Sequence, residues 1–262
     1  VLGRIFGPRP QILLESCSSG GNRFDLGMLC FGPQIWCSDN TDPISRLDIQ
    51  GGLSYLYPQS TFGAHVSAAP HAQTLRHTPL STRGNVSFFG VLGYELDLKH
   101  LLPVEVKQIK EQIRFYQQYR KLFQFGRFRR SENGWQVSDA QTVLAGVFHK
   151  QMDAAPGYEQ LRVPGLANRP YRVCSRAQEL RIGQFGALVK HVAPIELNPN
   201  GMILRTADRL ATLPDGMQEV TVSGGALEAG IVLQPLFRGT GYDKNQRTQG
   251  DYGSNVYLIE EE

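Results

Sequence analysis

The chain has 262 residues, of which 41% are hydrophobic and 19% are charged, and its formal net charge at pH 7 is +3. This composition is ordinary for a globular protein, and the small net charge with no long basic cluster argues against a nucleic-acid partner. No apolar run approaches the roughly 18 residues that span a bilayer, so we expect no membrane partner either.

In the first 100 residues, four short apolar runs each end in a segment of small and polar residues. The runs lie near 11–17, 34–38, 63–67 and 86–92. Short apolar runs of this kind are typical of parallel strands buried on both faces, so we predict parallel strands with their polar ends on one side. The fourth run overlaps a glycosylation sequon at Asn85, which we interpret as part of a buried strand rather than a glycosylated loop.

A helix is predicted from about Val104 to Phe123, where apolar residues recur at helical spacing. Pro103 stands at its start and Gly126 just past its end. Proline at the first helical position and glycine after the last are the punctuation that helices favour.

From about residue 125 onward, the chain becomes a series of short strand-like segments separated by Gly and Pro. The clearest are 134–137, 142–148, 159–163, 171–174, 219–222 and 255–259. Such a series is typical of an antiparallel β-sandwich.

The two patterns predict an α/β part followed by an all-β part. A (β/α)₈ barrel needs on the order of 250 residues, and only about half that length precedes the sandwich. We therefore predict that residues 1–130 form the C-terminal half of a (β/α)₈ barrel and that residues 131–262 form an antiparallel β-sandwich domain.

The polar strand ends are where barrel enzymes place their chemistry. Asp39 and Asp42 follow Trp36 directly at the second of these ends. A glycosidase needs one carboxyl group that can be protonated near neutral pH and a second carboxylate across the bond. Taken alone, however, the Asp39 segment fits a cap for the next helix better. Cys17 alone fits a buried core thiol better, and Gly20 fits a turn.

Two longer motifs are more specific than any of these residues alone. Residues 15–29 read Glu-Ser-Cys-Ser-Ser-Gly-Gly-Asn-Arg-Phe-Asp-Leu-Gly-Met-Leu, and residues 33–47 read Pro-Gln-Ile-Trp-Cys-Ser-Asp-Asn-Thr-Asp-Pro-Ile-Ser-Arg-Leu. Together they closely resemble glycoside hydrolase family 36, the α-galactosidases. The likeness continues at 63–70, 93–98, 222–227 and 250–254, and so covers nearly the whole chain.

The resemblance implies a retaining enzyme that hydrolyses terminal α-D-galactosyl residues of galacto-oligosaccharides, such as raffinose or melibiose, by double displacement. The family's acid/base aspartate matches Asp39. The cysteine that contacts the galactose 2-hydroxyl matches Cys17, and the glycine whose backbone approaches the same hydroxyl matches Gly20. The resemblance also implies that the full-length protein is a homo-oligomer, specifically a tetramer.

The family's nucleophilic aspartate lies in a Lys-Trp-Asp segment on an earlier strand, and this chain has no such segment. We therefore expect a fragment that lacks the nucleophile and is inactive alone. Two alternatives stay open: transglycosylation, in which a sugar replaces water as the acceptor, and a non-catalytic carbohydrate-binding sandwich module on a barrel remnant.

The cysteines and histidines indicate neither a disulfide scaffold nor a metal site. Four cysteines are too few for a disulfide framework in a chain of this length, and none has zinc-ligand spacing. We therefore expect reduced thiols and a cytoplasmic protein, with secretion as the alternative. The six histidines form no ligand pattern, so no metal or cofactor is expected. His65 and His71 are expected to pack or to orient other groups near the site.

Overall fold

The fold was determined as a computed structural model that describes residues 1–262 except 22–23, 154–156, 189–197, 199, 216 and 234–248. The α-helices are α1 (Leu2–Phe6), α2 (Ser18–Gly21), α3 (Leu26–Leu29), α4 (Pro43–Leu53), α5 (Leu80–Ser87), α6 (Pro103–Phe125), α8 (Met202–Leu210) and α9 (Gly224–Ala229). The 3-10 helices are η1 (Gln59–Thr61), η2 (Leu98–His100) and η3 (Ile182–Leu188).

The strands fall into a parallel N-terminal group and an antiparallel C-terminal group. The first group contains β1 (Glu15–Ser16), β2 (Gln34–Ile35), β3 (Gly63–Ser67) and β4 (Val91–Glu95). The second contains β5 (Arg127–Ser131), β6 (Gly134–Ser138), β7 (Thr142–Phe148), β8 (Gln160–Leu161), β9 (Pro170–Ser175), β10 (Glu179–Arg181), β11 (Thr212–Pro214), β12 (Glu219–Ser223), β13 (Ile231–Val232) and β14 (Ser254–Glu261).

The parallel strands follow one another in chain order. β1 pairs with β2 and β3 pairs with β4, both in parallel register, and a parallel bridge from Ile35 to Phe62 links the two pairs. The strand predicted at 63–67 is confirmed as β3. The strand predicted near 11–17 is confirmed only at its end, because Ile12 and Leu13 are exposed and only β1 is paired.

The strand predicted at 86–92 is wrong over its first half. Residues Leu80–Ser87 form helix α5, and the strand β4 starts only at Val91. A short apolar run does not distinguish a buried strand from a buried helix by periodicity. Every residue of α5 is buried, so its sequence shows no amphipathic period. Asn85 is fully buried, as expected, but on this helix.

Most polar residues of α5 are buried together with a hydrogen-bond partner. Asn85 donates to Gln178 Oε1 at 3.2 Å and to Ser254 Oγ at 2.9 Å, and Thr82 Oγ1 lies 2.8 Å from the same Ser254 hydroxyl. Arg83 donates to the Ser67 carbonyl oxygen at 2.6 Å. Hydrogen bonding offsets the cost of removing such groups from water, so a polar helix fills an interior position.

The long predicted helix is confirmed as α6. Pro103 occupies its first turn and Gly126 follows its last residue. The side chain of Glu105 accepts a hydrogen bond from the Leu102 backbone nitrogen at 2.9 Å, which satisfies one of the free amide groups at the helix start.

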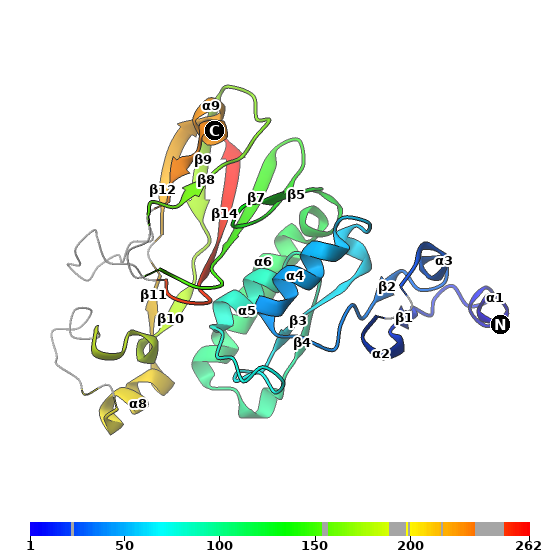
Figure 1. Ribbon diagram of the computed structural model, residues 1–262, viewed down its shortest axis with the longest axis horizontal. Helices are drawn as coiled ribbons and strands as arrows, with labels where there is room; N and C mark the ends of the chain where they lie inside the picture. The colour runs from blue at the N-terminus through cyan, green and yellow to red at the C-terminus, as the bar shows by residue number, and fades with distance from the viewer. Residues whose placement is uncertain (22–23, 154–156, 189–197, 199, 216, 234–248) are drawn as a thin grey trace.

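The antiparallel part is built on one six-stranded sheet in the order β12-β9-β14-β7-β6-β5 (Figure 1). It contains the predicted segments 134–137, 142–148, 171–174, 219–222 and 255–259, and 159–163 contributes to the smaller β13-β8 pair. An antiparallel sheet is therefore confirmed. The domain division at residue 130 stays a prediction, although the first sheet strand begins close by at Arg127.

This sheet is covered on both faces. Leu144 and Phe148 of β7 pack with Phe89 and Phe123 against the α5–α6 side. Val143, on the opposite face of β7, packs in a separate cluster with side chains from β8 and α9. Successive residues of a strand point to opposite faces, so a doubly covered strand has an unbroken apolar sequence.

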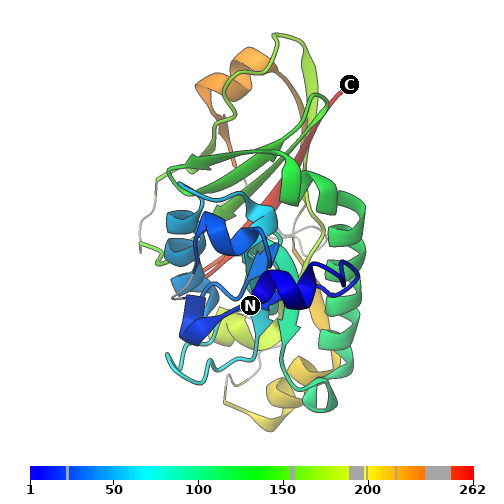
Figure 2. The same ribbon diagram turned by 90° about the vertical axis from the view of Figure 1, so that its right-hand side faces the viewer.

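The molecule is extended, and its N-terminal segment projects from it. Figure 1 shows α1, α3 and the β1–β2 pair at one end, with the antiparallel sheet and the C-terminus at another, and in Figure 2 the N-terminal end faces the viewer. Helices α4, α5 and α6 lie between them. None of the helices in the described ranges is long and apolar enough to cross a membrane.

Candidate active site

The carboxyl ends of β1 and β2 meet at the same edge, and this places the two predicted motifs side by side. Ser16 pairs with Ile35, and the next residue, Trp36, donates its backbone N–H to the Ser16 carbonyl oxygen at 2.8 Å. Parallel strands present their carboxyl ends at one edge of a sheet. The segments that begin at Cys17 and Cys37 therefore leave this edge next to each other.

Asp39 is an exposed carboxylate at this edge, held by its neighbours in the loop. The indole N–H of Trp36 donates to Asp39 Oδ1 at 2.9 Å. Asp39 itself is exposed, whereas Trp36 is half-buried. Among the described residues, this is the hydrogen bond that Asp39 accepts, and no described group bonds to its Oδ2.

Gly20 lies directly against Asp39. A methyl group added at Gly20 would lie 3.3 Å from the Asp39 backbone nitrogen and 3.4 Å from its Oδ2. The φ of Gly20 is +71° and that of Gly21 is +86°, a region that favours glycine. The α2 segment is accordingly a turn with non-helical dihedral angles rather than a regular helix.

Cys17 opens the same turn. Its carbonyl oxygen accepts a hydrogen bond from the Gly21 backbone nitrogen at 3.1 Å, and its thiol is free and half-buried. The structure thus brings Gly20 into contact with Asp39 and places Cys17 at the start of the turn that carries Gly20. Residues 22–23 of the motif lie outside the described residues. The sugar contacts expected of Cys17 and Gly20 stay predictions.

The helix-capping function considered for this loop belongs to Asp42 rather than Asp39. Asp42 is fully buried at the N-cap of α4, where its Oδ2 accepts from the Ser45 backbone nitrogen at 3.0 Å. The same oxygen forms an ion pair with Arg76. Of the two carboxylates in the motif, Asp42 therefore stabilises the start of α4, and Asp39 remains accessible.

A buried arginine that the sequence reasoning did not single out supports the Asp39 loop. Arg46 of α4 is 1% exposed and donates to the carbonyl oxygens of Ser38 at 2.8 Å and Asn40 at 2.7 Å. It also donates to Gly63 O at 2.9 Å and to the thiol sulfur of Cys37 at 2.8 Å. Arg46 therefore fixes the backbone on both sides of Asp39. In the sequence, only the position of Arg46 on the helix that follows Asp42 could have suggested that it supports this loop.

Burial shifts the pKa of both members of the Arg46–Cys37 contact. Burial lowers the pKa of the Arg46 guanidinium, and the charges of Asp39 and Glu95 act in the opposite direction. Burial raises the pKa of the Cys37 thiol, although the charge of Arg46 opposes the rise. We therefore describe this contact as a thiol that accepts a hydrogen bond from a charged guanidinium.

The two histidines named from the sequence lie behind the loop. The ring of His65 on β3 stacks against Trp36, with centroids 4.1 Å apart. Burial, with the charge of Arg46, lowers the pKa of His65 to about 4, so the ring is neutral at neutral pH. His71 Nε2 lies 3.1 Å from Thr41 Oγ1. Among the described residues, neither histidine hydrogen-bonds to Asp39; His65 packs against Trp36, which donates to Asp39.

Comparison with protein-family models matches residues 1–126 to the Melibiase family. Among curated proteins, the chain is 44% identical over 183 residues to α-galactosidase AgaA of Geobacillus stearothermophilus, covering 66% of this chain and 25% of that protein. It is 49% identical over 139 residues to the bifunctional α-galactosidase/sucrose kinase AgaSK of Mediterraneibacter gnavus, covering 53% of this chain and 14% of that protein.

Solved structures match the whole fold. The crystal structure of the family 36 α-galactosidase AgaA of Geobacillus stearothermophilus aligns with 100% of this chain and 30% of its own, with a TM-score of 0.73 and 32% identity. Variants of that protein were solved with raffinose, at a TM-score of 0.73, and with stachyose, at 0.74. The chain therefore spans between about a seventh and a third of the length of these relatives.

Proposed function

Because the chain belongs to glycoside hydrolase family 36, we propose that it supplies the acid/base half of the active site of a retaining α-galactosidase. The observation that carries the proposal is that the two aspartates of this loop lie in different environments. Asp42 caps α4, whereas Asp39 is exposed at the carboxyl edge of the parallel strands, bonded to Trp36 and against Gly20.

In the proposed reaction, Asp39 acts twice. A protonated Asp39 donates its proton to the glycosidic oxygen as the aglycone leaves and a second carboxylate attacks the anomeric carbon. The ionised Asp39 then removes a proton from water as water hydrolyses the glycosyl-enzyme. The second carboxylate is the family's nucleophile, which we do not place in this chain.

We propose α-galactosides such as raffinose and melibiose as substrates, because related enzymes were crystallised with raffinose and stachyose. Cys17 and the backbone of Gly20 would contact the 2-hydroxyl of the galactosyl ring. The proximity of Gly20 to Asp39 supports this assignment, because a 2-hydroxyl lies next to the anomeric carbon where the acid/base acts.

The arrangement of the strands supports the finer fold proposal. Parallel strands in chain order, interrupted by α4, α5 and α6, fit half of a (β/α)₈ barrel for residues 1–130. The doubly covered antiparallel sheet fits a sandwich-type domain for residues 131–262. We further propose a homo-oligomer, specifically a tetramer, for the full-length enzyme, and a cytoplasmic location, since all four cysteines are free thiols.

The test is the variant Asp39→Asn in the full-length enzyme, which keeps the shape of the side chain but cannot cycle a proton. Turnover of substrates with poor leaving groups should fall by about 10²–10⁴-fold, the usual contribution of a general acid/base. Substrates with good leaving groups need no protonation in the first step, so their glycosylation step should suffer less.

Azide identifies the role of Asp39 by the stereochemistry of the product. Attack on an α-galactoside from the β face gives a β-linked glycosyl-enzyme, which azide then displaces from the α face. Asp39→Asn should therefore release the α-galactosyl azide, as read from the anomeric proton by NMR. Release of the β-galactosyl azide would identify Asp39 as the nucleophile. Unchanged turnover of both substrate classes would exclude an acid/base role.

A further inference from the structure

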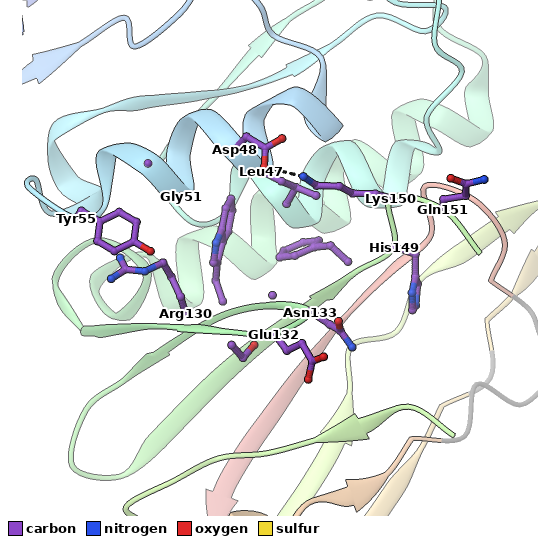
Figure 3. A pocket seen from close by; sticks show the side chains of 15 residues that line it. Leu47, Asp48, Gly51, Tyr55, Arg130, Glu132, Asn133, His149, Lys150 and Gln151 are labelled. Atoms are coloured by element: carbon purple, nitrogen blue, oxygen red, sulfur yellow. Dashed lines mark hydrogen bonds and ion pairs between the residues drawn. The ribbon is translucent and has the colours of Figure 1, made fainter. Parts of the chain in front are cut away.

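A cleft of about 720 Å³ lies between α4 and the β5–β6 hairpin (Figure 3), and Asp39 is not among its lining residues. Asp39 precedes the first residue of α4, whereas the cleft begins at Leu47 and continues to Tyr55, beyond the end of the helix. An 11-residue helix is about 16 Å long. The cleft and the proposed active site therefore lie toward opposite ends of α4.

A pair of interacting side chains lies at each end of the cleft. The guanidinium of Arg130 lies over the ring of Tyr55 at 3.6 Å and donates to Ser54 Oγ at 2.8 Å. Such stacking and hydrogen bonding hold both planar groups in place. At the other end, Lys150 Nζ lies 2.6 Å from Asp48 Oδ1, and Figure 3 shows this pair across the cleft from Glu132.

The floor of the cleft contains a polar donor, the indole N–H of Trp135. Trp135 is 5% exposed and lines the cleft, and within the described part of the chain its indole N–H forms no hydrogen bond. This N–H is not fully buried, so a ligand in the cleft can reach it. The N–H lies 3.7 Å from where a methyl group at Gly51 would stand, so it is directed toward the helix side of the cleft.

Two consecutive glycines keep the helix side open. A methyl group at Gly52 would meet no atom within 4 Å. A glycine inside a helix costs roughly 0.5–1 kcal/mol relative to alanine. The pair Gly51–Gly52 therefore lowers the stability of α4 at the place where any larger side chain would narrow the cleft.

We propose that this cleft binds a short neutral oligosaccharide, with the Trp135 N–H as a donor to one of its hydroxyl groups. The volume lies within the range of about 300–1,000 Å³ that is usual for small-molecule sites. Asp48 and Glu132 balance Arg130 and Lys150, so the lining does not select an ion of either sign. The Trp135 N–H and the side-chain amides of Asn133 and Gln151 provide hydrogen-bonding groups that suit the hydroxyl groups of a neutral sugar. This site goes beyond the proposed function and does not depend on it.

The two tryptophans of the chain make the two sites separately visible. The indole N–H of Trp36 reports on Asp39, and that of Trp135 reports on the cleft. The chain labelled with ¹⁵N is titrated with raffinose, and both indole signals are followed by NMR. We expect a saturable shift of the Trp135 signal. A shift of the Trp36 signal alone would place the sugar only at the Asp39 site and would overturn the proposal.

The variant Gly52→Gln fills the cleft without removing any of its hydrogen-bonding groups, and the gain in helix propensity protects the fold. It should weaken the raffinose-dependent shift of Trp135 by at least about tenfold in affinity. Asp39→Asn, the matched control, should leave that shift unchanged. Unchanged binding by Gly52→Gln would overturn the site. A saturable response of Trp135 to ATP but not to raffinose would overturn the ligand class.

Discussion

At the scale of single residues, the loop between β2 and α4 shows how two aspartates three positions apart take different parts. Asp42 is buried, capped onto Ser45 and paired with Arg76. Asp39 stays exposed because Arg46 holds the carbonyl oxygens on both sides of it, so the side chain is not needed to stabilise the loop. The local segment taken alone favoured a capping function, and only the family resemblance singled out Asp39.

His65 should make the stability of the chain depend on pH in a defined window. Its pKa in the folded state is about 4, against an ordinary value of 6.5, because burial and the charge of Arg46 disfavour the protonated ring. The unfolded chain therefore binds more protons below pH 6.5. This contribution to stability is fully present above pH 6.5, is lost as the pH falls, and levels off below about pH 4.

The variant His65→Gln should remove this part of the pH dependence. Urea unfolding of the wild type and the variant at several pH values gives the difference between their free energies of unfolding. That difference should shift in favour of the variant as the pH falls from 7 to 4. His77→Gln, at an exposed position, is the control and should track the wild type. A constant difference for His65→Gln would contradict the burial argument.

At the scale of elements, α4 and α5 contain glycines that look alike in sequence and differ in their surroundings. A methyl group at Gly52 meets nothing within 4 Å, whereas one at Gly84 would lie 2.5 Å from the side chain of Gln112. Gln112 cannot move away easily, because it is buried, donates to the Leu80 carbonyl oxygen at 2.8 Å and accepts from the Tyr94 hydroxyl at 3.1 Å.

The same substitution should therefore have opposite effects in the two helices. Gly52→Ala should stabilise the chain by roughly 0.5–1 kcal/mol, because it reduces the backbone entropy lost on folding. Gly84→Ala should destabilise it by about 1–3 kcal/mol, because it overpacks the α5–α6 contact. Thermal unfolding followed by circular dichroism measures both. Destabilisation by Gly52→Ala would show that the space beside α4 is filled.

The elements also show where sequence patterns are sufficient. α6 has one face toward the core and a proline and a glycine at its ends, so its period and punctuation predicted it within two residues. α5 is buried on all sides, so it has no period, and the apolar residues after it led to a strand prediction that started too early. Its burial depends on partners such as Ser254, which follows it by more than 160 positions.

At the scale of the whole molecule, the proposed mechanism requires two carboxylates, and this chain supplies Asp39. We therefore expect residues 1–262 alone to show no turnover of an aryl α-galactoside, because double displacement needs a nucleophile as well as an acid/base. The measurement is release of the aryl alcohol by the purified chain, with its Asp39→Asn variant as the blank. Saturable hydrolysis that Asp39→Asn abolishes would mean that the nucleophile lies within these residues.

The sequence by itself determined the family resemblance, the candidate residues Asp39, Cys17 and Gly20, helix α6 and most strands of the antiparallel sheet. These depend on local signals: contiguous motifs, periodicity of two or 3.6, and the placement of proline and glycine. Such signals act over a few residues and can be read without knowing what packs against them.

Only the tertiary structure decided which aspartate caps α4, how Arg46 supports the Asp39 loop, and that α5 is a helix. It alone brought Gly20 against Asp39 and enclosed the cleft over Trp135. The physical reason is common to all of these features. Each depends on groups that are far apart in the chain. The free-energy cost of burying a polar group depends on whether the fold places a hydrogen-bond partner beside it.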